Sequence, residues 1–183
     1  MISLTLISSF TLLQIVKLPV GEKFSELYLL GPQKMAQDLP FNIAPGQNYT
    51  VYLGVGNHLD TATYYCCIVK IRNQTEPAAT QTNPSMLVSL YNYRTLLQND
   101  ANSTVPLCFF FSEVSFSNNQ SILKTLIIND NKLSLDKSAL FDQENSGYYY
   151  QIFVELWALN PVNRVFEYQN RFVYFWLNAT SNV

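Results

Sequence analysis

The chain has 183 residues, enough for one domain with a sizeable core, and 48% of them are hydrophobic. Only 13% are charged, about half the usual share, and the net charge is −2. There is no basic run and no arginine cluster, so the chain lacks the positive surface that nucleic-acid-binding proteins usually carry. Neutral polar side chains replace the charges. Such a surface has few groups whose charge changes with pH. It is typical of a protein in an acidic environment, or of a secreted domain in general.

Residues 2–18 are apolar and carry no charge before Lys17. A signal peptide would have a basic start and a small-residue cleavage site, and a membrane helix would carry fewer hydroxyl side chains. A period of two fits better, because it gathers apolar side chains on one face of an extended strand. That face would carry Ile2, Leu4, Leu6, Phe10, Leu12, Val16 and Leu18.

An extended segment of this length would span roughly 55 Å at ~3.3 Å per residue, about three times an ordinary strand. We therefore interpret residues 1–18 as a donor strand that pairs with a sheet edge in another molecule. Residues 19–22 would form a linker and residues 23–183 the body. Two other interpretations stay open: a membrane or signal segment, and the first strand of the body itself.

The body repeats strand patterns that are separated by polar turns and shows no convincing helix. We predict about eight strands, over residues 24–30, 47–56, 62–72, 86–97, 104–113, 121–128, 148–159 and 164–177. This pattern predicts an all-β fold, an immunoglobulin-like or pilin-like β-sandwich with an extended N-terminal donor strand. Residues 172–177 are apolar on both faces, which is typical of a central buried strand. Residues 132–145 give no clear pattern and allow a short helical turn.

Five Asn-x-Ser/Thr sequons lie at strand ends or in polar turns, where a sugar would stand in solvent. They are Asn48, Asn73, Asn102, Asn119 and Asn178. We predict an extracellular glycoprotein whose only added groups are N-glycans.

The chain has three cysteines, Cys66, Cys67 and Cys108. Adjacent cysteines rarely bridge each other, so a disulfide would join Cys108 to one of the other two. Strand alternation turns Cys67 inward and places Cys66 and Cys108 on outward faces. We therefore favour a Cys66–Cys108 bridge, with three free thiols as the alternative.

No constellation for catalysis is present. The sole histidine, His58, lies in a polar turn-like stretch, and residues 129–131 resemble a hairpin turn more than a calcium loop, which would need a later Gly and Glu. There is no nucleophile elbow and no phosphate-binding loop. We predict no enzymatic activity, no metal and no small-molecule substrate. Lys17 and Lys70 are candidates for the Lys–Asn isopeptide bonds found in some β-sandwich pilins.

Three segments carry a family resemblance: residues 24–32 (FSELYLLGP), 49–58 (YTVYLGVGNH) and 175–180 (FWLNAT). They resemble the immunoglobulin-like ectodomain of a family of archaeal membrane proteins, in which several membrane helices precede the domain. Together with the strand-like first segment, the sequons and the low charge, the chain resembles the thread subunits of thermoacidophilic Sulfolobales archaea. Those subunits form thin glycosylated surface filaments.

The resemblance implies a head-to-tail homopolymer of identical subunits, joined by donor-strand complementation, that serves adhesion or biofilm formation at an S-layer-covered cell surface. Seven buried apolar side chains at roughly 1.5–3 kcal/mol each would contribute about 10–20 kcal/mol gross to each joint. The alternative function is a membrane-anchored immunoglobulin-like ectodomain that binds a cell-surface partner.

Overall fold

The computed structural model of the protein describes residues 22–180, and these residues form strands and no helix. The predicted all-β class is therefore confirmed. The donor strand predicted over residues 1–18, and most of the predicted linker, lie outside the described residues. The strands are β1 (Phe24–Leu30), β2 (Asn42–Ile43), β3 (Tyr49–His58), β4 (Thr63–Asn73), β5 (Tyr91–Leu97), β6 (Asn102–Ser117), β7 (Gln120–Ile128), β8 (Asn131–Asp142), β9 (Gly147–Leu159) and β10 (Phe166–Ala179).

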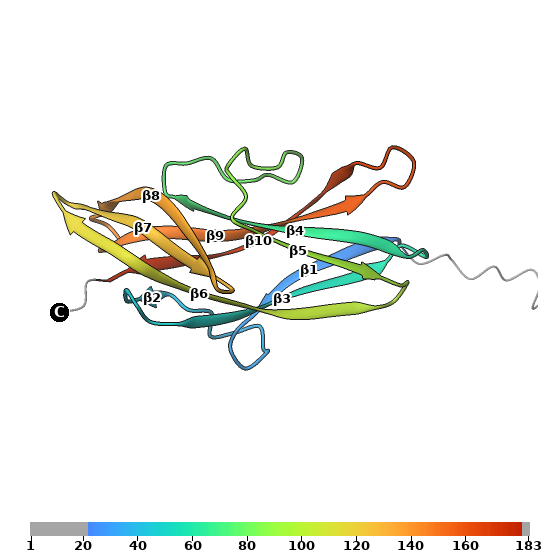
Figure 1. Ribbon diagram of the computed structural model, residues 1–183, viewed down its shortest axis with the longest axis horizontal. Helices are drawn as coiled ribbons and strands as arrows, with labels where there is room; N and C mark the ends of the chain where they lie inside the picture. Colours follow the sequence, from blue (N-terminus) through green and yellow to red (C-terminus); the bar gives the residue numbers. More distant parts are fainter. Residues whose placement is uncertain (1–21, 181–183) are drawn as a thin grey trace, which may run out of the picture.

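The strands form two layers that face each other across the core (Figure 1). One layer has the order β1-β3-β6-β7-β8, and the other has the order β5-β4-β9-β10-β2. The β8–β9 hairpin joins the layers at one corner through two residue pairs. All paired strands are antiparallel except β2, which runs parallel to β10. Each layer thus ends in strands that have only one partner along most of their length.

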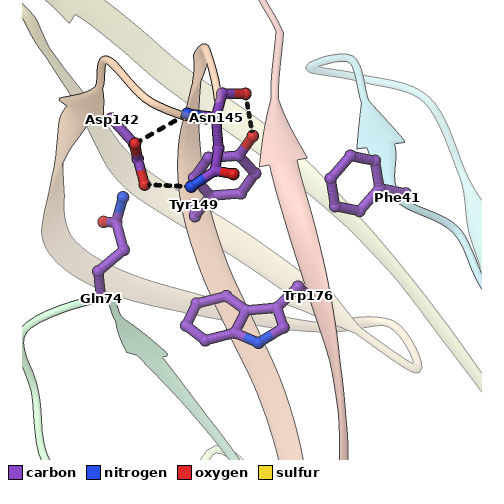
Figure 2. A pocket seen from close by; sticks show the side chains of 6 residues that line it. All are labelled: Phe41, Gln74, Asp142, Asn145, Tyr149 and Trp176. Atoms are coloured by element: carbon purple, nitrogen blue, oxygen red, sulfur yellow. Dashed lines mark hydrogen bonds between the residues drawn. The ribbon is translucent and has the colours of Figure 1, made fainter.

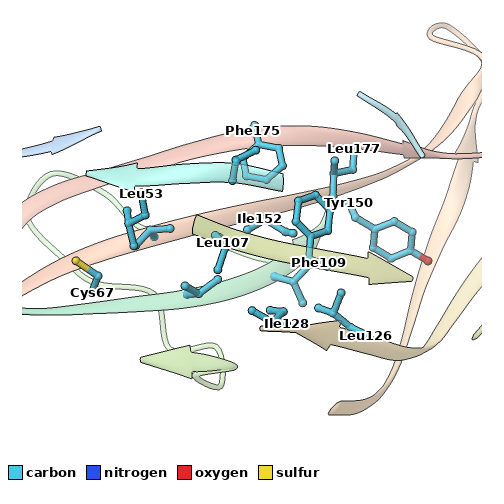
Figure 3. Close-up of a cluster of buried hydrophobic side chains, with 14 of the residues drawn as sticks. Leu53, Cys67, Leu107, Phe109, Leu126, Ile128, Tyr150, Ile152, Phe175 and Leu177 are labelled. Carbon is cyan, nitrogen blue, oxygen red and sulfur yellow. The ribbon is translucent and has the colours of Figure 1, made fainter. Parts of the chain in front are cut away.

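The core lies between the layers, where alternate side chains of the strands point inward (Figure 3). The β-branched and aromatic residues that favour strands supply most of this surface, and each fully buried side chain contributes roughly 1.5–3 kcal/mol. The buried set includes Val51, Leu53 and Val55 of β3, Leu107, Phe109 and Phe111 of β6, Cys67 and Val69 of β4, and Ile152 and Val154 of β9.

Two tight turns fix the register of β6, β7 and β8. Asn118 and Asn119 join β6 to β7, with φ of 49° and 60°, and Asn129 and Asp130 join β7 to β8, with φ of 43° and 65°. Two-residue hairpin turns with positive φ at both positions favour Asn and Asp, because these residues tolerate the left-handed region best after Gly. The hairpin predicted at residues 129–131 is confirmed.

Two predictions of local structure are wrong. Residues 132–142 hold no helical turn, because β8 runs as a strand through Asp142 and its pairing with β7 outweighs its weak pattern, while residues 143–146 form the turn into β9. Residues 172–177 are not a central strand: β10 pairs with β9 on one side, and Tyr174 is 51% exposed. Their apolar character therefore needs another explanation than burial between two neighbours.

The predicted Cys66–Cys108 bridge is also wrong, since all three cysteines are free. Cys66 is buried on β4 and Cys108 is exposed on β6, in the opposite layer. Cys67 is the one that points into the core, as alternation predicted. Because Cys66 and Cys108 lie on the outer faces of two different layers, the core separates their sulfur atoms.

Candidate strand-binding groove

The edges of β1 and β10 approach each other on one side of the molecule without pairing. β1 pairs with β3 alone, and β10 pairs with β9 and, at its end, with β2 through Asn178 and Ala179. Within the described residues, the second edge of β10 from 166 to 177 therefore has no strand partner. Unpaired backbone groups at two neighbouring edges are a template for an additional strand.

Three cavities follow this seam, with volumes of about 160, 310 and 370 Å³. The first and second share Arg171, and the second and third share Leu27, Phe172 and Tyr174. Because consecutive cavities share wall residues, they form one elongated depression, which we call the β1/β10 groove. An elongated depression suits an extended chain better than a compact ligand.

The floor of the β1/β10 groove is the uncovered margin of the hydrophobic core. Leu27, Leu29, Leu39 and Val173 line it, are only partly buried, and pack against the core cluster. Tyr174 at the rim is half exposed. Apolar surface of this kind is seldom left open on a monomer and usually marks a binding surface.

A buried polar network holds β1 in place as one wall of the groove. The hydroxyl groups of Ser25 on β1 and Tyr65 on β4 lie 2.7 Å apart, and Tyr65 Oη donates to Asn57 Oδ1 at 3.0 Å. Asn57 is fully buried, and its Nδ2 donates to the carbonyl of Leu97 at 3.0 Å. Burial raises the pKa of Tyr65, which keeps its hydroxyl protonated. These hydrogen bonds tie β1 to β4 without a further strand.

The charged residues that line the groove are two cations. Lys23 and Arg171 line the cavity nearest the start of β1, Arg171 also lines the next cavity, and none of the residues lining the three cavities is acidic. Lys23 Nζ is paired with Asp60 Oδ2 at 3.2 Å, so Arg171 supplies most of the net positive charge at this end of the groove. A cation in a segment that binds the groove would be repelled from Arg171.

The structure separates the sequons into two kinds. Asn48, Asn102 and Asn119 are exposed. Asn73 and Asn178 are half-buried, and their side chains are hydrogen-bonded. The first three are open to a sugar without rearrangement.

Asn178 ties β10 to its neighbours. Its Oδ1 accepts a hydrogen bond from the backbone N–H of Tyr148 at 3.0 Å, and its Nδ2 donates to Asn42 Oδ1 at 3.0 Å. A Cβ atom at Gly147 would lie 2.3 Å from Asn178 Oδ1, so only glycine allows this approach. The short β2 strand, which the sequence did not predict, is fixed by this contact.

Lys70, a candidate for an isopeptide bond, has other partners. Its Nζ donates to Glu155 Oε2 at 2.9 Å and to the carbonyl of Ser85 at 2.6 Å. An isopeptide bond needs an Asn carboxamide at this nitrogen, and neither recorded contact is one. The pair is an ion pair that joins β4 to β9.

His58 ends β3 instead of lying in a turn. Its Nδ1 is 3.0 Å from Asp100 Oδ1, its Nε2 is 3.5 Å from Glu26 Oε1, and its ring stacks on Phe24 at 4.7 Å between centroids. These contacts link β1 to β3 at the surface. Over residues 22–180, no group of three or more His, Cys, Asp or Glu side chains is arranged to hold a metal ion.

In comparisons with known proteins, a domain of unknown function (DUF1616) matches residues 18–107, which is 90 of the 183 residues. No curated protein matches the chain. In the described part of the chain no helix is long and apolar enough to cross a membrane.

Among solved structures, a β-glucosidase from Listeria innocua in complex with glucose is 13% identical, with a TM-score of 0.46 over 86% of this chain. The chain spans 16% of that enzyme. The complex of zinc 2-glycoprotein and prolactin inducible protein from human seminal plasma matches at 12% identity and a TM-score of 0.41, over 88% of this chain and 99% of the matched one. The C-terminal domain of wzt matches at 8% identity and a TM-score of 0.38, over 89% and 81%. Likenesses of this degree give no indication of function.

Proposed function

We propose that the protein is the subunit of an extracellular filament, in which residues 2–18 of one copy fill the β1/β10 groove of the next. The observation that carries this proposal is the pair of unpaired edges above an open margin of the core. A strand added along the open edge of β10 would satisfy the backbone groups of that edge and cover the apolar floor. The proposal also explains why residues 172–177 are apolar although β10 pairs over this stretch with β9 alone.

The lengths agree. The unpaired edge of β10, residues 166–177, extends about 40 Å at ~3.3 Å per residue. The apolar segment of residues 2–18 would extend roughly 55 Å, which covers this edge and leaves a few residues to reach the neighbouring body. The apolar face of the segment would meet the groove, while the face with Ser3 and Thr5 would meet solvent.

The positions of the chain ends favour an open polymer. Figure 1 shows that β1 begins at one end of the long axis, and that β10 finishes at the opposite end. A segment that precedes β1 is therefore next to the β10 end of a copy stacked in the same orientation. Such an interface is heterologous and does not close on itself, so it propagates as a filament.

The same stacking gives the strand a direction. Residue 18 would lie near the end of β10 and residue 2 near its beginning, so the donor strand would run parallel to β10, as β2 does. This direction also keeps Lys17, the one charge of the segment, away from Arg171. The positions of the chain ends and the charges thus both favour a donor strand that runs parallel to β10.

Exposed sequons at Asn48, Asn102 and Asn119 and a charge-poor surface support an extracellular setting. Adhesion or biofilm formation is the role that we assign to such a filament, with identical subunits as its partners.

The test compares two matched double variants of the full chain by negative-stain electron microscopy and size-exclusion chromatography. Leu6→Asp with Phe10→Asp places charges on the apolar face, and Thr5→Asp with Thr11→Asp places them on the other face. We expect the first to abolish filaments and the second to retain them. Equal filament formation by both variants would refute the proposal. Failure of both, together with partition of the protein into lipid vesicles, would instead support the membrane-anchored ectodomain.

A further inference from the structure

A second cavity, separate from the groove, lies on the outer face of the β9/β10 layer (Figure 2). Its volume is about 310 Å³, and it shares no lining residue with the β1/β10 groove. Pockets for small ligands occupy about 300–1,000 Å³, so this cavity suits one or two small rings. Its walls are Phe41, Gln74, Asp142, Asn145, Tyr149 and Trp176.

Half of these residues are aromatic, and they come from three separate segments. Tyr149 on β9 and Trp176 on β10 point outward from the layer, and Phe41 precedes β2. The rings of Phe41 and Tyr149 are tilted, with centroids 6.0 Å apart. The guanidinium of Arg72 lies 5.0 Å from the centroid of the Trp176 ring, which holds the indole in place. The cavity thus has apolar walls, of which Trp176 is held by Arg72 and Phe41 is half exposed.

Asp142 and Asn145 lie at the β8–β9 turn and form part of a polar wall beside the aromatic rings (Figure 2). Asp142 Oδ1 accepts hydrogen bonds from the backbone N–H groups of Glu144 and Asn145 at 3.0 Å, and its Oδ2 accepts one from Asn145 Nδ2 at 3.0 Å. These bonds lower the pKa of Asp142, and the one from the Asn145 side chain lowers it most. A fixed acceptor therefore faces the aromatic walls.

Two further groups complete this polar wall. Tyr149 Oη donates to the carbonyl of Asn145 at 2.6 Å, which fixes the turn against the ring. Gln74 donates a long 3.4 Å hydrogen bond from Nε2 to the carbonyl of Leu140, and no bond of its Oε1 is recorded. Carboxylate and carboxamide groups at fixed positions are suited to adjacent hydroxyl groups, because each of them can take part in more than one hydrogen bond.

We infer that this cavity binds a pyranose ring of a neutral saccharide. The C–H faces of a pyranose pack on aromatic rings, while its equatorial hydroxyls point sideways to acceptors such as Asp142 and Gln74. An anionic ligand would be repelled by the carboxylate of Asp142. A wholly apolar ligand would remove water from that carboxylate without replacing its hydrogen bonds. A neutral ring with several hydroxyl groups can pack on the aromatic wall and donate hydrogen bonds to the polar wall.

Such a ring could belong to a separate molecule or to a glycan of the same chain. Asn178 follows Trp176 by two residues on the same strand face and pairs in register with Tyr149. A sugar on Asn178 would thus stand beside the cavity. The chemistry of the ligand is the same in both cases, and the experiment separates the two sources.

The experiment titrates neutral monosaccharides and disaccharides into the unglycosylated full chain, followed by ¹H–¹⁵N chemical shifts and saturation-transfer NMR. Binding is expected to perturb Gln74 and the Trp176 indole. Trp176→Ala should weaken it at least tenfold and Asp142→Asn several-fold. Tyr52→Ala, which removes a half-buried ring from β3, should leave binding unchanged. No perturbation by any saccharide, or one unaffected by Trp176→Ala, would overturn the inference.

A second arm uses the natively glycosylated chain before and after enzymatic removal of its N-glycans, which leaves the hydrogen-bonding side chain at position 178 in place. If the ligand is the glycan of Asn178, free saccharides bind only after the glycans are removed. If it belongs to another molecule, both chains bind equally. Because the readout does not depend on filaments, its outcome is independent of the donor-strand proposal.

Discussion

Lys70 Nζ and Glu155 Oε2 lie 2.9 Å apart, and their side chains are only 7% and 0% exposed. The pair lies on the outer face of the β4/β9 layer, beneath the segment that precedes β5. Glu155 also accepts the backbone N–H of Ser85 at 2.7 Å and the indole N–H of Trp157 at 3.2 Å. Within the described residues no buried side-chain nitrogen or oxygen lacks a hydrogen-bond partner. The two charges are thus satisfied away from water.

Removal of one partner should destabilise the protein strongly. We expect Glu155→Ala to lower the free energy of unfolding by about 3–5 kcal/mol, because Lys70 would remain buried without a counter-ion. Lys70→Met with Glu155→Leu should cost much less, since both charges disappear together. Urea denaturation monitored by circular dichroism measures both. Lys124→Ala, which breaks an exposed 3.5 Å pair with Glu113, serves as the control and should cost less than about 1 kcal/mol.

The three cysteines should differ in reactivity. Cys108 is exposed, whereas Cys66 and Cys67 are buried, so iodoacetamide should modify one thiol per folded chain at pH 8. Burial raises the pKa of Cys67 to about 12, and the neighbouring Cys66 adds to the shift. In urea all three should react. Mass spectrometry of the alkylated chain counts the adducts, and a chain that gains no adducts before reduction would contradict the free-thiol arrangement.

Much of the fold follows from local sequence, and the remainder depends on contacts between distant segments. The alternation of side chains along β4 correctly predicted that Cys67 points into the core. The Asn-Asp turn after β7 was likewise predictable from residues 129–131. The strand β8 was not, because pairing with β7 compensates for its mixed pattern. The β1/β10 groove could not be foreseen, since an apolar strand at an open edge has the same sequence pattern as a buried central one. Nor could the cavity beside Trp176, whose walls come from segments far apart in the sequence.

The stability of the protein should fall on the alkaline side. Cys67 ionises near pH 9 in the unfolded chain and near pH 12 in the folded one, chiefly because burial disfavours the thiolate. The contribution of Cys67 to the free energy of unfolding is complete below pH 9. Between pH 9 and pH 12 this contribution falls by about 1.4 kcal/mol per pH unit. Burial raises the pKa of Tyr65 and of Tyr150 as well, which adds a loss above pH 10.

Urea denaturation at pH 8 and pH 10 measures this loss, and Cys67→Ala isolates the thiol. The variant should be less stable at both values because of the cavity it creates, but its loss between them should be about 1 kcal/mol smaller. An identical loss in both proteins would show that Cys67 does not cause the loss of stability at alkaline pH.

The sequons should differ in their structural cost. Asn73 Oδ1 accepts the backbone N–H groups of Thr75 and Glu76 at 2.9 Å, and its Nδ2 donates to the carbonyl of Ser138 at 2.8 Å. Asn73→Ala should therefore cost about 1–3 kcal/mol, since it leaves these groups unpaired. Asn48→Ala, at an exposed position, should cost less than about 0.5 kcal/mol. Thermal unfolding of unglycosylated variants compares them, and equal costs would contradict the structural role of Asn73.

The direction of the donor strand can be tested in a Cys108→Ser background by cross-linking with a bismaleimide, whose spacer does not require the two cysteine side chains to face each other. Ser3→Cys and Ile15→Cys lie on the face of the strand that would point away from the groove, so neither removes an apolar plug. Each is combined with Gln169→Cys, which lines the cavity nearest the start of β1. A strand parallel to β10 brings residue 3 to residue 169, whereas an antiparallel strand brings residue 15 there.

We expect Ser3→Cys with Gln169→Cys to give a ladder of covalent oligomers on non-reducing gels, and Ile15→Cys with Gln169→Cys to remain largely monomeric on the same gels. The reverse pattern would contradict the parallel direction but leave strand exchange in place. Covalent oligomers from neither pair, in filaments seen by microscopy, would mean that the subunits join through a surface other than the β1/β10 groove. Since Gln169 is at the cationic end of the groove, a third pair that adds Lys17→Glu tests the electrostatic argument. Reversal of that charge should raise the small yield of the antiparallel pair, because it replaces repulsion from Arg171 by attraction.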